Sequence, residues 1–246
     1  MRVFAFGEKP GDEMTSREKH VKRPDAVLFD LDGLLADTEE LHIYAYEAVG
    51  TYLGTPLARD YICSFIGGPT RENVKRVMHD FNVPMERFEE VLKVRYDSYV
   101  DAIAKTVLRP MEGSLDCVLE VKKRKYKTAL VTSSLRAHAM AVLQNLSRHW
   151  NSGRDIASLF DVTVFGDEIE YLKPAPDIYL EAVRRLGSSP ESCTALEDSE
   201  FGVISAKRAG LYVIAVPGPH TKDQHFRSAD VVAGSMTEVL ERGLIP

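Results

Sequence analysis

Cysteine is scarce in this sequence, and its three copies are scattered. Cys63, Cys117 and Cys193 form no CxxC pair and leave an odd number, so neither a disulfide framework nor a cysteine metal site is indicated. We interpret them as reduced, mostly buried small residues of an intracellular protein.

Long hydrophobic runs are also missing. No apolar stretch approaches the roughly 18 residues that a membrane-spanning helix requires, and the run Val3–Phe6 after Arg2 is far too short for a signal-peptide core. Residues 8–24 are charged and show no apolar period, so we predict a flexible tail over residues 1–24. We therefore expect a cytoplasmic protein with no membrane partner.

Strong charge of either sign is missing as well. The formal net charge is −6 over 246 residues. The short basic run Lys122–Lys125 is typical of a solvated helix end rather than of a nucleic-acid surface. With 44% hydrophobic residues, the chain can bury a sizeable core as one large domain or two modest ones. We expect a monomer that binds no nucleic acid.

What the sequence does contain is an alternation of short apolar runs with longer amphipathic segments. This pattern is typical of a parallel β-sheet whose strands are connected by crossover helices. Strands are predicted at Ala26–Phe29, Lys127–Val131, Val162–Phe165, Cys193–Leu196 and Leu211–Val216, with a weaker one at Asp230–Val232. Helices are predicted at Asp177–Leu186 and Ser199–Ala209.

The interval between the first two strands breaks this rhythm. Residues 37–106 show only helical periodicity, interrupted by Gly54–Pro56, Gly67–Pro69 and Asn82–Pro84. We therefore predict an α/β fold: a Rossmann-like parallel-sheet core formed by residues 25–36 and 107–246, with an inserted helical cap domain at residues 37–106. The insert is expected to be hinged over the sheet.

Polar residues follow four of the predicted strands. Because ligands of open parallel sheets bind beyond the carboxyl ends of the strands, we expect these residues to converge on one edge. They are Asp30 and Asp32 after the first strand, Thr132, Ser133 and Ser134 after the second, Lys173 in the loop after the third, and Glu197 and Asp198 after the fourth.

These residue types suit phosphoryl transfer. Glu197, Asp198 and one carboxylate of the first pair make an oxygen site suited to Mg²⁺. Thr132 and Ser133 would open the next helix, whose N-terminal N–H groups favour phosphate.

The two acids of the first pair would divide the chemistry. Asp30, held by Lys173 and the metal, is expected to stay ionised and attack phosphorus as a nucleophile. Asp32 is expected to act as the acid and base, protonating the leaving oxygen and later accepting a proton from water. Lys173 would also serve as a cation for the oxygens of the transferred group.

The quoted motifs resemble those of a known family. FDLDGLLADTE, LVTSS, the lysine of LKPAPDIY and LEDSEFG occur in the order of the four motifs of the haloacid dehalogenase superfamily, and the helical insert resembles its C1 cap. The resemblance extends from about Asp25 to Val232.

That resemblance implies Mg²⁺ as cofactor and an aspartyl-phosphate intermediate. It assigns the nucleophile to Asp30, the acid/base to Asp32, phosphate binding to Thr132 and the cation to Lys173. The implied metal ligands are Asp30, Glu197, Asp198 and the backbone carbonyl of Asp32.

Within the superfamily, the sequence is most similar to the sugar-phosphatase and β-phosphoglucomutase branch. FIGGPTREN resembles the cap's specificity loop, which places Arg71 toward a phosphate or carboxylate of the substrate, and His42 falls where the mutases carry a histidine. Ordinary structural roles on cap helices remain open for both. Asp101 and Leu135 stand where we align two mutase lysines, with Arg136 one place late, so hydrolysis is favoured over the mutase reaction.

The leading hypothesis is a phosphoric monoester hydrolase that acts on a small phosphorylated metabolite such as a sugar phosphate. A phosphosugar mutase is the first alternative. A phospho-aspartate receiver domain is a weaker one, since it would lack Asp32 and the insert, and a true dehalogenase would need neither Mg²⁺ nor a second aspartate. We also expect His138 at the surface and Trp150 in the core. Residues 149–159 have no functional interpretation from the sequence.

Overall fold

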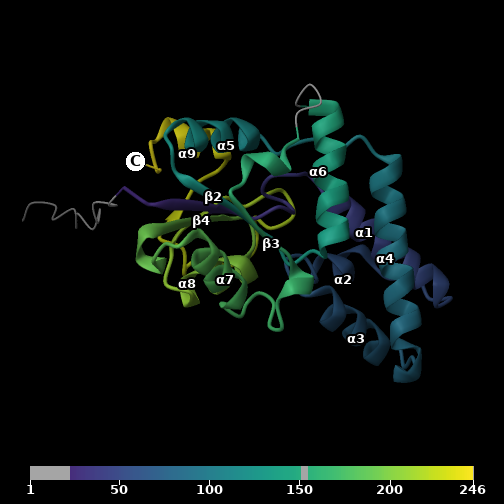
Figure 1. Cartoon of the computed structure of the whole chain (residues 1–246). Helices are drawn as coiled ribbons and strands as arrows, with labels where there is room; N and C mark the ends of the chain where they lie inside the picture. Colours follow the sequence, from purple (N-terminus) through teal and green to yellow (C-terminus); the bar gives the residue numbers. More distant parts are fainter. Residues whose placement is uncertain (1–22, 151–154, 246) are drawn as a thin grey trace, which may run out of the picture.

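A parallel β-sheet with helices on both faces forms one half of the molecule, and a helical lobe forms the other (Figure 1). The computed structural model describes residues 23–150 and 155–245. In this part of the chain the six-stranded sheet has the order β3-β2-β1-β4-β5-β6, and all neighbouring strands run parallel. The strands are β1 Ala26–Phe29, β2 Lys127–Val131, β3 Val162–Val164, β4 Cys193–Glu197, β5 Tyr212–Ala215 and β6 Val231–Val232. The predicted α/β class is confirmed.

Strand β1 shows why the sheet is covered on both faces. Its side chains alternate, as extended backbone requires: Val27 and Phe29 join one hydrophobic cluster, whereas Ala26 and Leu28 join another. The first cluster contains side chains of α5, α6 and α9, and the second contains side chains of α7 and α8. These helices are α5 Ser114–Lys123, α6 Arg136–Trp150, α7 Asp177–Leu186, α8 Glu200–Arg208 and α9 Met236–Glu241. Figure 1 shows α5 and α9 on the opposite side of the sheet from α7 and α8.

The insert between β1 and β2 is helical, as the sequence predicts. Its helices are α1 Glu39–Tyr52, α2 Arg59–Cys63, α3 Thr70–Asp80 and α4 Phe88–Lys105, with a 3₁₀ turn at Met85–Arg87. Further 3₁₀ turns lie in the sheet half at Ala157–Leu159, Gly166–Glu168 and Pro190–Ser192. The insert has a hydrophobic cluster of its own, which includes Ile43, Val77 and Leu92. Leu41, Tyr99 and Ile103 of the insert instead belong to the cluster that contains Val27 and Phe29, so the insert also packs against the sheet half.

The two connections between the lobe and the sheet half lie side by side. The amide of Asp37 donates to the carbonyl of Arg109 at 2.9 Å. Beside this crossing, the buried Asn145 of α6 accepts from the amide of Leu108 at 3.0 Å and donates to the carbonyls of Ile103 and Thr106 at 2.9 and 2.7 Å. One side chain thus satisfies three backbone groups where α4 returns to the sheet half.

Two predictions about α6 are wrong. His138 is 8% exposed rather than at the surface, because it packs between α6 and α4 with its ring 5.1 Å from that of Tyr96 and 5.4 Å from that of Tyr99. Trp150, at the end of α6, is 54% exposed rather than in the core.

Two predicted segments lie largely or partly outside the residues that the structure describes. The tail predicted at residues 1–24 lies almost entirely outside the described residues, as does part of 149–159. Cys117 and Cys193 are buried and Cys63 is half-buried, and all three are thiols. In the described ranges no helix is long and apolar enough to cross a membrane.

Candidate active site

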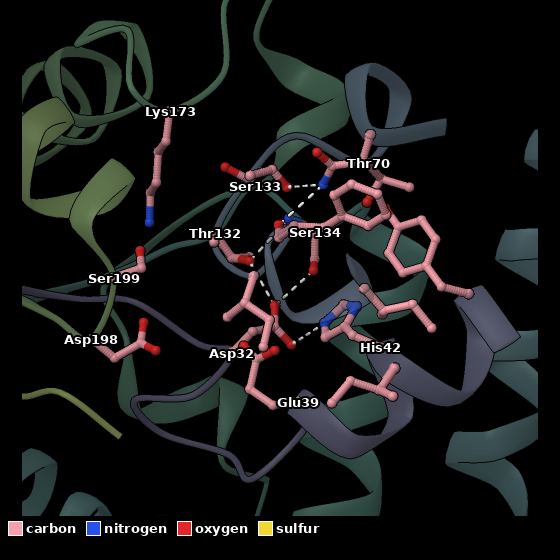
Figure 2. Close-up of a pocket in the computed structure, with 18 of the residues that line it drawn as sticks. Asp32, Glu39, His42, Thr70, Thr132, Ser133, Ser134, Lys173, Asp198 and Ser199 are labelled. Atoms are coloured by element: carbon pink, nitrogen blue, oxygen red, sulfur yellow. Dashed lines mark hydrogen bonds and ion pairs between the residues drawn. The ribbon is translucent and has the colours of Figure 1, made fainter. Parts of the chain in front are cut away.

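The carboxyl ends of β1, β2 and β4 bring the predicted site residues to one edge of the sheet. Asp30 follows the last residue of β1, Thr132 follows β2, and Glu197 ends β4 with Asp198 next to it. All except Glu197 line a cavity between this edge and the helical lobe (Figure 2). The cavity is also lined by Asp32, His42, Ser133, Ser134 and Lys173.

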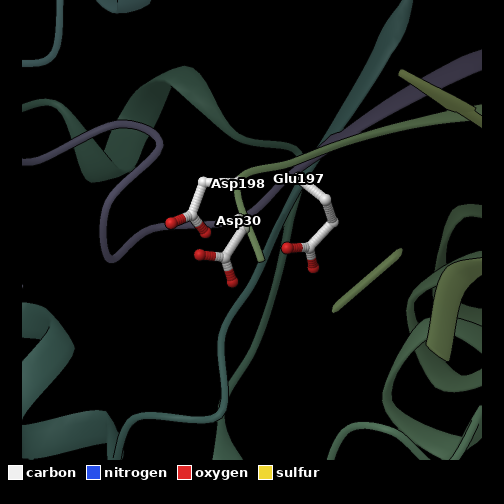
Figure 3. Close-up of side chains that lie close together, drawn as sticks. All are labelled: Asp30, Glu197 and Asp198. Carbon is white, nitrogen blue, oxygen red and sulfur yellow. The ribbon is translucent and has the colours of Figure 1, made fainter. Parts of the chain in front are cut away.

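Three buried carboxylates form the centre of the site (Figure 3). Asp30, Glu197 and Asp198 each place an oxygen within 4.8 Å of the other two. Their exposed fractions are 6%, 0% and 2%. The chain turns away directly after β1 at Gly33, whose φ is +78° and against which the Asp198 carboxylate packs. A side chain at position 33 would occupy the space of that carboxylate, since an added Cβ would lie 2.3 Å from its Oδ2.

Lys173 bridges two of these acids. Its ammonium donates to Asp30 Oδ1 at 2.5 Å, to Glu197 Oε1 at 2.6 Å and to the carbonyl of Val131 at 3.1 Å. Burial alone would lower the pKa of Lys173, but Asp30 and Glu197 hold it above its usual value. Because all three N–H groups of the ammonium are used in these bonds, Lys173 acts first on the acids and holds them in place.

One ammonium does not compensate three carboxylates. Burial raises the pKa of Asp30 to about 8 even though Lys173 opposes the shift, and burial together with Asp30 and Glu39 raises the pKa of Asp198. Three carboxylates and one ammonium leave two negative charges, which a divalent cation would balance. Glu197 Oε2 is buried and has no hydrogen-bond partner among the described residues, and such an orphaned oxygen is a further sign of unmet positive charge. The oxygen-only donor set therefore fits a hard cation such as Mg²⁺.

Asp32 lies apart from this cluster, and its carboxylate accepts a set of hydrogen bonds. Thr38 and Tyr99 donate to Oδ1 at 2.8 and 3.2 Å, and Ser134 and Thr132 donate to Oδ2 at 2.7 and 3.2 Å. Burial acts to raise the pKa of Asp32, but His42 first, and then the hydrogen bonds from Ser134 and Thr38, hold that pKa below its usual range. In this arrangement Asp32 is ionised and can accept a proton, and its role as the acid and base stays a prediction.

His42 connects Asp32 to a buried arginine. Arg95 Nη2 lies 2.6 Å from His42 Nδ1, and His42 Nε2 lies 3.4 Å from Asp32 Oδ1. Figure 2 shows the second of these contacts. A guanidinium can only donate, so Nδ1 must accept and the imidazole proton must be on Nε2, facing Asp32. Burial lowers the pKa of His42 although Asp32 opposes the shift, and Arg95 adds to the lowering. His42 is therefore a neutral donor to Asp32.

The hydroxyl cluster predicted after the second strand also lies in the cavity. Thr132 Oγ1 accepts from the amide of Ser134 at 3.0 Å, which folds Thr132–Ser134 into a tight turn before α6. Ser133 Oγ is buried and has no hydrogen-bond partner in the described part of the chain. A hydroxyl in that position is suited to bind an oxygen of a ligand.

Arg71 is not brought to the site. Its guanidinium donates to Glu89 at 2.8 Å and stacks on Phe88 at 4.8 Å, on the outer surface of the lobe. The cation that the lobe does place in the cavity is Arg95 of α4, which is 2% exposed. Asp101, which stands where we align a mutase cap lysine, forms a surface pair with Lys105.

Three further cavity residues were missed in the sequence. Glu39, Tyr46 and Arg95 are all buried and line the cavity. Tyr46 Oη and Arg95 Nε have no hydrogen-bond partner within the described ranges, although the two groups stack, with the guanidinium 4.6 Å from the ring centre. A readable signal existed for Arg95: it lies on the same helical stripe as Phe88, Leu92 and Tyr99, where an apolar residue would be expected.

Comparisons with known proteins identify the family of this chain. A family model described as haloacid dehalogenase-like hydrolase matches residues 27–216. A relative from Thermotoga maritima, named phosphorylated carbohydrates phosphatase, is 34% identical over 189 residues, which cover 76% of this chain and 82% of the relative. A relative from Bacillus subtilis, named beta-phosphoglucomutase, is 29% identical over 221 residues, which cover 87% of this chain and 91% of the relative.

A solved structure of similar fold is found as well. The crystal structure of CbbY from Rhodobacter sphaeroides in complex with phosphate matches with a TM-score of 0.74 at 29% identity, covering 88% of this chain and 96% of that chain. The resemblance predicted from the four sequence motifs is thereby confirmed.

The burial of Glu39 generates a testable prediction. Burial first, and then Asp32 and Asp30, raise the pKa of Glu39 from 4.5 to about 8. The unfolded chain loses this proton above pH 4.5 while the folded chain keeps it, so the free energy of unfolding must fall as the pH rises between these values. In metal-free protein, Glu39→Gln should remove roughly 2–4 kcal/mol of that fall.

Urea denaturation at pH 5 and pH 8 in the presence of EDTA measures this difference. The exposed Glu47 on the same helix provides the matched control, and Glu47→Gln should keep the wild-type pH dependence. An identical pH dependence in Glu39→Gln and wild type would show that Glu39 is ionised in the folded protein.

Proposed function

The chain belongs to the haloacid dehalogenase-like hydrolase family and is a phosphatase of that family, and we propose that it is a Mg²⁺-dependent phosphoric monoester hydrolase acting on a small phosphorylated carbohydrate. The observation that carries the proposal is the cluster of Asp30, Glu197 and Asp198 around Lys173 at the sheet edge. The name of the Thermotoga maritima relative supports the substrate class.

The proposed reaction consists of two displacements at phosphorus. A carboxylate oxygen of Asp30 forms a bond to phosphorus, the ester P–O bond breaks, and the leaving oxygen takes up a proton. Water then attacks the same phosphorus, gives up a proton, and releases phosphate as the Asp30 carboxylate is restored. Mg²⁺ bound by the carboxylates would neutralise charge on the phosphoryl oxygens. The Ser133 hydroxyl, buried without a partner in the described chain, would bind one of those oxygens.

Asp32 remains our candidate for the proton transfers. It is ionised in the arrangement described above, which suits the second displacement, in which it accepts a proton from water. To protonate the leaving oxygen in the first displacement, the carboxyl group must first leave the hydrogen bonds from Thr38, Ser134 and His42. We propose that binding of substrate exchanges these bonds.

The helical lobe supplies the surface for the rest of the substrate, and we propose that residues 37–106 act as a cap domain. The side of the cavity formed by the lobe combines an apolar wall of Ile43, Ile62 and Phe65 with the buried Arg95 and Tyr46. Both Arg95 Nε and the Tyr46 hydroxyl can donate to an oxygen. A carbohydrate phosphate that presents an anionic or hydroxyl oxygen at its distal end matches these two donors.

The phosphosugar mutase alternative is not favoured. A mutase has to hold a second phosphate near the hydroxyl cluster, where this chain has Leu135. Arg136 does not fill this role, because its guanidinium bonds Glu168 and stacks on the ring of Phe165 at 4.4 Å. Arg95 supplies a cation in the cavity, whereas Asp101 and Leu135 stand where we align two mutase lysines. The assay below therefore measures isomerised product beside inorganic phosphate.

A panel of phosphorylated carbohydrates, assayed for inorganic phosphate with Mg²⁺ and with EDTA, tests the proposal. We expect Mg²⁺-dependent release from at least one compound, and a loss of at least about a thousandfold in Asp30→Asn. The exposed neighbour Asp37 gives the control, since Asp37→Asn should retain activity. Release that is unaffected by Asp30→Asn contradicts the proposal, and isomerised product without phosphate would instead favour the mutase.

The same panel tests the position of the cap cation. Arg95→Met should raise KM about 10–100-fold for the best substrate, since a charge-assisted hydrogen bond is lost. Arg71→Met should change KM less than about twofold, because the structure directs Arg71 to Glu89. A larger effect of Arg71→Met than of Arg95→Met would show that the lobe presents a different cation to the substrate.

A further inference from the structure

The segment 217–229, which follows β5, contacts the lobe through the side chain of Gln224. Gln224 Nε2 donates to the carbonyl of Ile66 at 3.2 Å, and Gln224 Oε1 accepts from the amide of Glu200 at 2.8 Å. We propose that Gln224 is a positioning residue that holds the cap loop Phe65–Gly68 over the active site and thereby sets the affinity for carbohydrate substrates. This inference rests on the proposed phosphatase function.

The two hydrogen bonds fix the orientation of the amide. The Ile66 carbonyl can only accept, and the Glu200 amide can only donate. Exchanging the nitrogen and oxygen of Gln224 would therefore set two acceptors against each other at Ile66 and two donors at Glu200. The amide of Gln224 therefore bonds both partners in one orientation: the Ile66 carbonyl in the lobe and the amide of Glu200, the first residue of α8.

Both ends of this bridge border the cavity. Ile66 and Gly67 line the cavity from the lobe side, and Ser199, which precedes Glu200, lines it from the sheet side beside Asp198. The two walls are in direct contact, because a Cβ added at Gly67 would lie 2.7 Å from the Cβ of Ser199. Gly67 has a φ of +81°, so the loop reaches this position in a backbone conformation that favours glycine.

Two further polar contacts of this segment lie beside the bridge. His220 Nε2 lies 3.3 Å from Glu40 Oε1, and Glu40, whose side chain is 57% exposed, also pairs with Arg59. The amide of His225 approaches Glu200 Oε2 at 3.4 Å. Neither contact reaches the cap loop, and among the described residues Gln224 is the group of this segment that hydrogen-bonds to it.

Gln224→Glu separates the two halves of the bridge. The variant is isosteric and retains an acceptor for the Glu200 amide, where negative charge at the start of α8 is also tolerated. Facing the Ile66 carbonyl, however, it puts an oxygen in place of the donor. We expect an unchanged urea midpoint, a KM raised about tenfold for the best carbohydrate phosphate, and a kcat within about twofold of wild type. For acetyl phosphate, which has no carbohydrate part, KM should stay within about twofold.

Amide hydrogen exchange gives a readout that is independent of activity. The amides of the cap loop should exchange several-fold faster in Gln224→Glu, and Gln224→Met, which removes both hydrogen bonds without adding charge, should show the same exchange and the same KM split. Lys222→Ala, an exposed position on the same segment, should behave as wild type.

Equal KM changes for both substrates, or an unchanged exchange rate in the cap loop, would overturn the inference. If wild type hydrolyses no phosphate ester, the proposed function fails, while the exchange rates still decide whether Gln224 holds the loop.

Discussion

Three carboxylates buried at the end of one sheet are stable only when positive charge accompanies them. Lys173 provides part of that charge by bonding Asp30 and Glu197 at 2.5 and 2.6 Å. Burial raises the pKa of Asp30 and Asp198, and the neighbouring carboxylates add to the rise. The sheet edge is therefore suited to a divalent cation. The rest of the structure follows from this requirement: the strands deliver the acids, Gly33 lets the chain pass Asp198, and the loop after β3 brings Lys173 to them.

The second acid of the first motif is kept out of this charged centre. Asp32 accepts hydrogen bonds from neutral donors. Thr38, His42 and Tyr99 belong to the insert, whereas Thr132 and Ser134 follow β2. Two carboxylates separated by one residue thus have different environments, one set by the sheet edge and the other by the lobe. This division lets Asp30 respond to metal and Asp32 respond to the position of the lobe and of the substrate.

The sequence was sufficient for the sheet, the insert and the residues at the strand ends, because each depends on a short-range pattern. Short, mostly apolar segments mark β1, β2 and β4, and polar residues at their carboxyl ends have to meet at one edge. It was insufficient where burial depends on packing between helices distant in sequence. Arg71 looked suited to a ligand but pairs with Glu89. Arg95 was missed and His138 was placed at the surface, because the packing of α4 against α1 and α6 cannot be read from periodicity. The partner of Gln224 lies 158 residues away, and no local pattern reports it.

The central claim is that Asp30 is the nucleophile, and it is tested most directly by trapping the enzyme during turnover. Wild-type protein is mixed with substrate and Mg²⁺, quenched in acid within milliseconds, digested, and mapped by mass spectrometry. The account predicts one added phosphoryl group on the peptide that carries Asp30, which is absent in EDTA and absent in Asp30→Asn. A phosphoryl group on any other residue, or rapid turnover with no phosphorylated peptide, would contradict it.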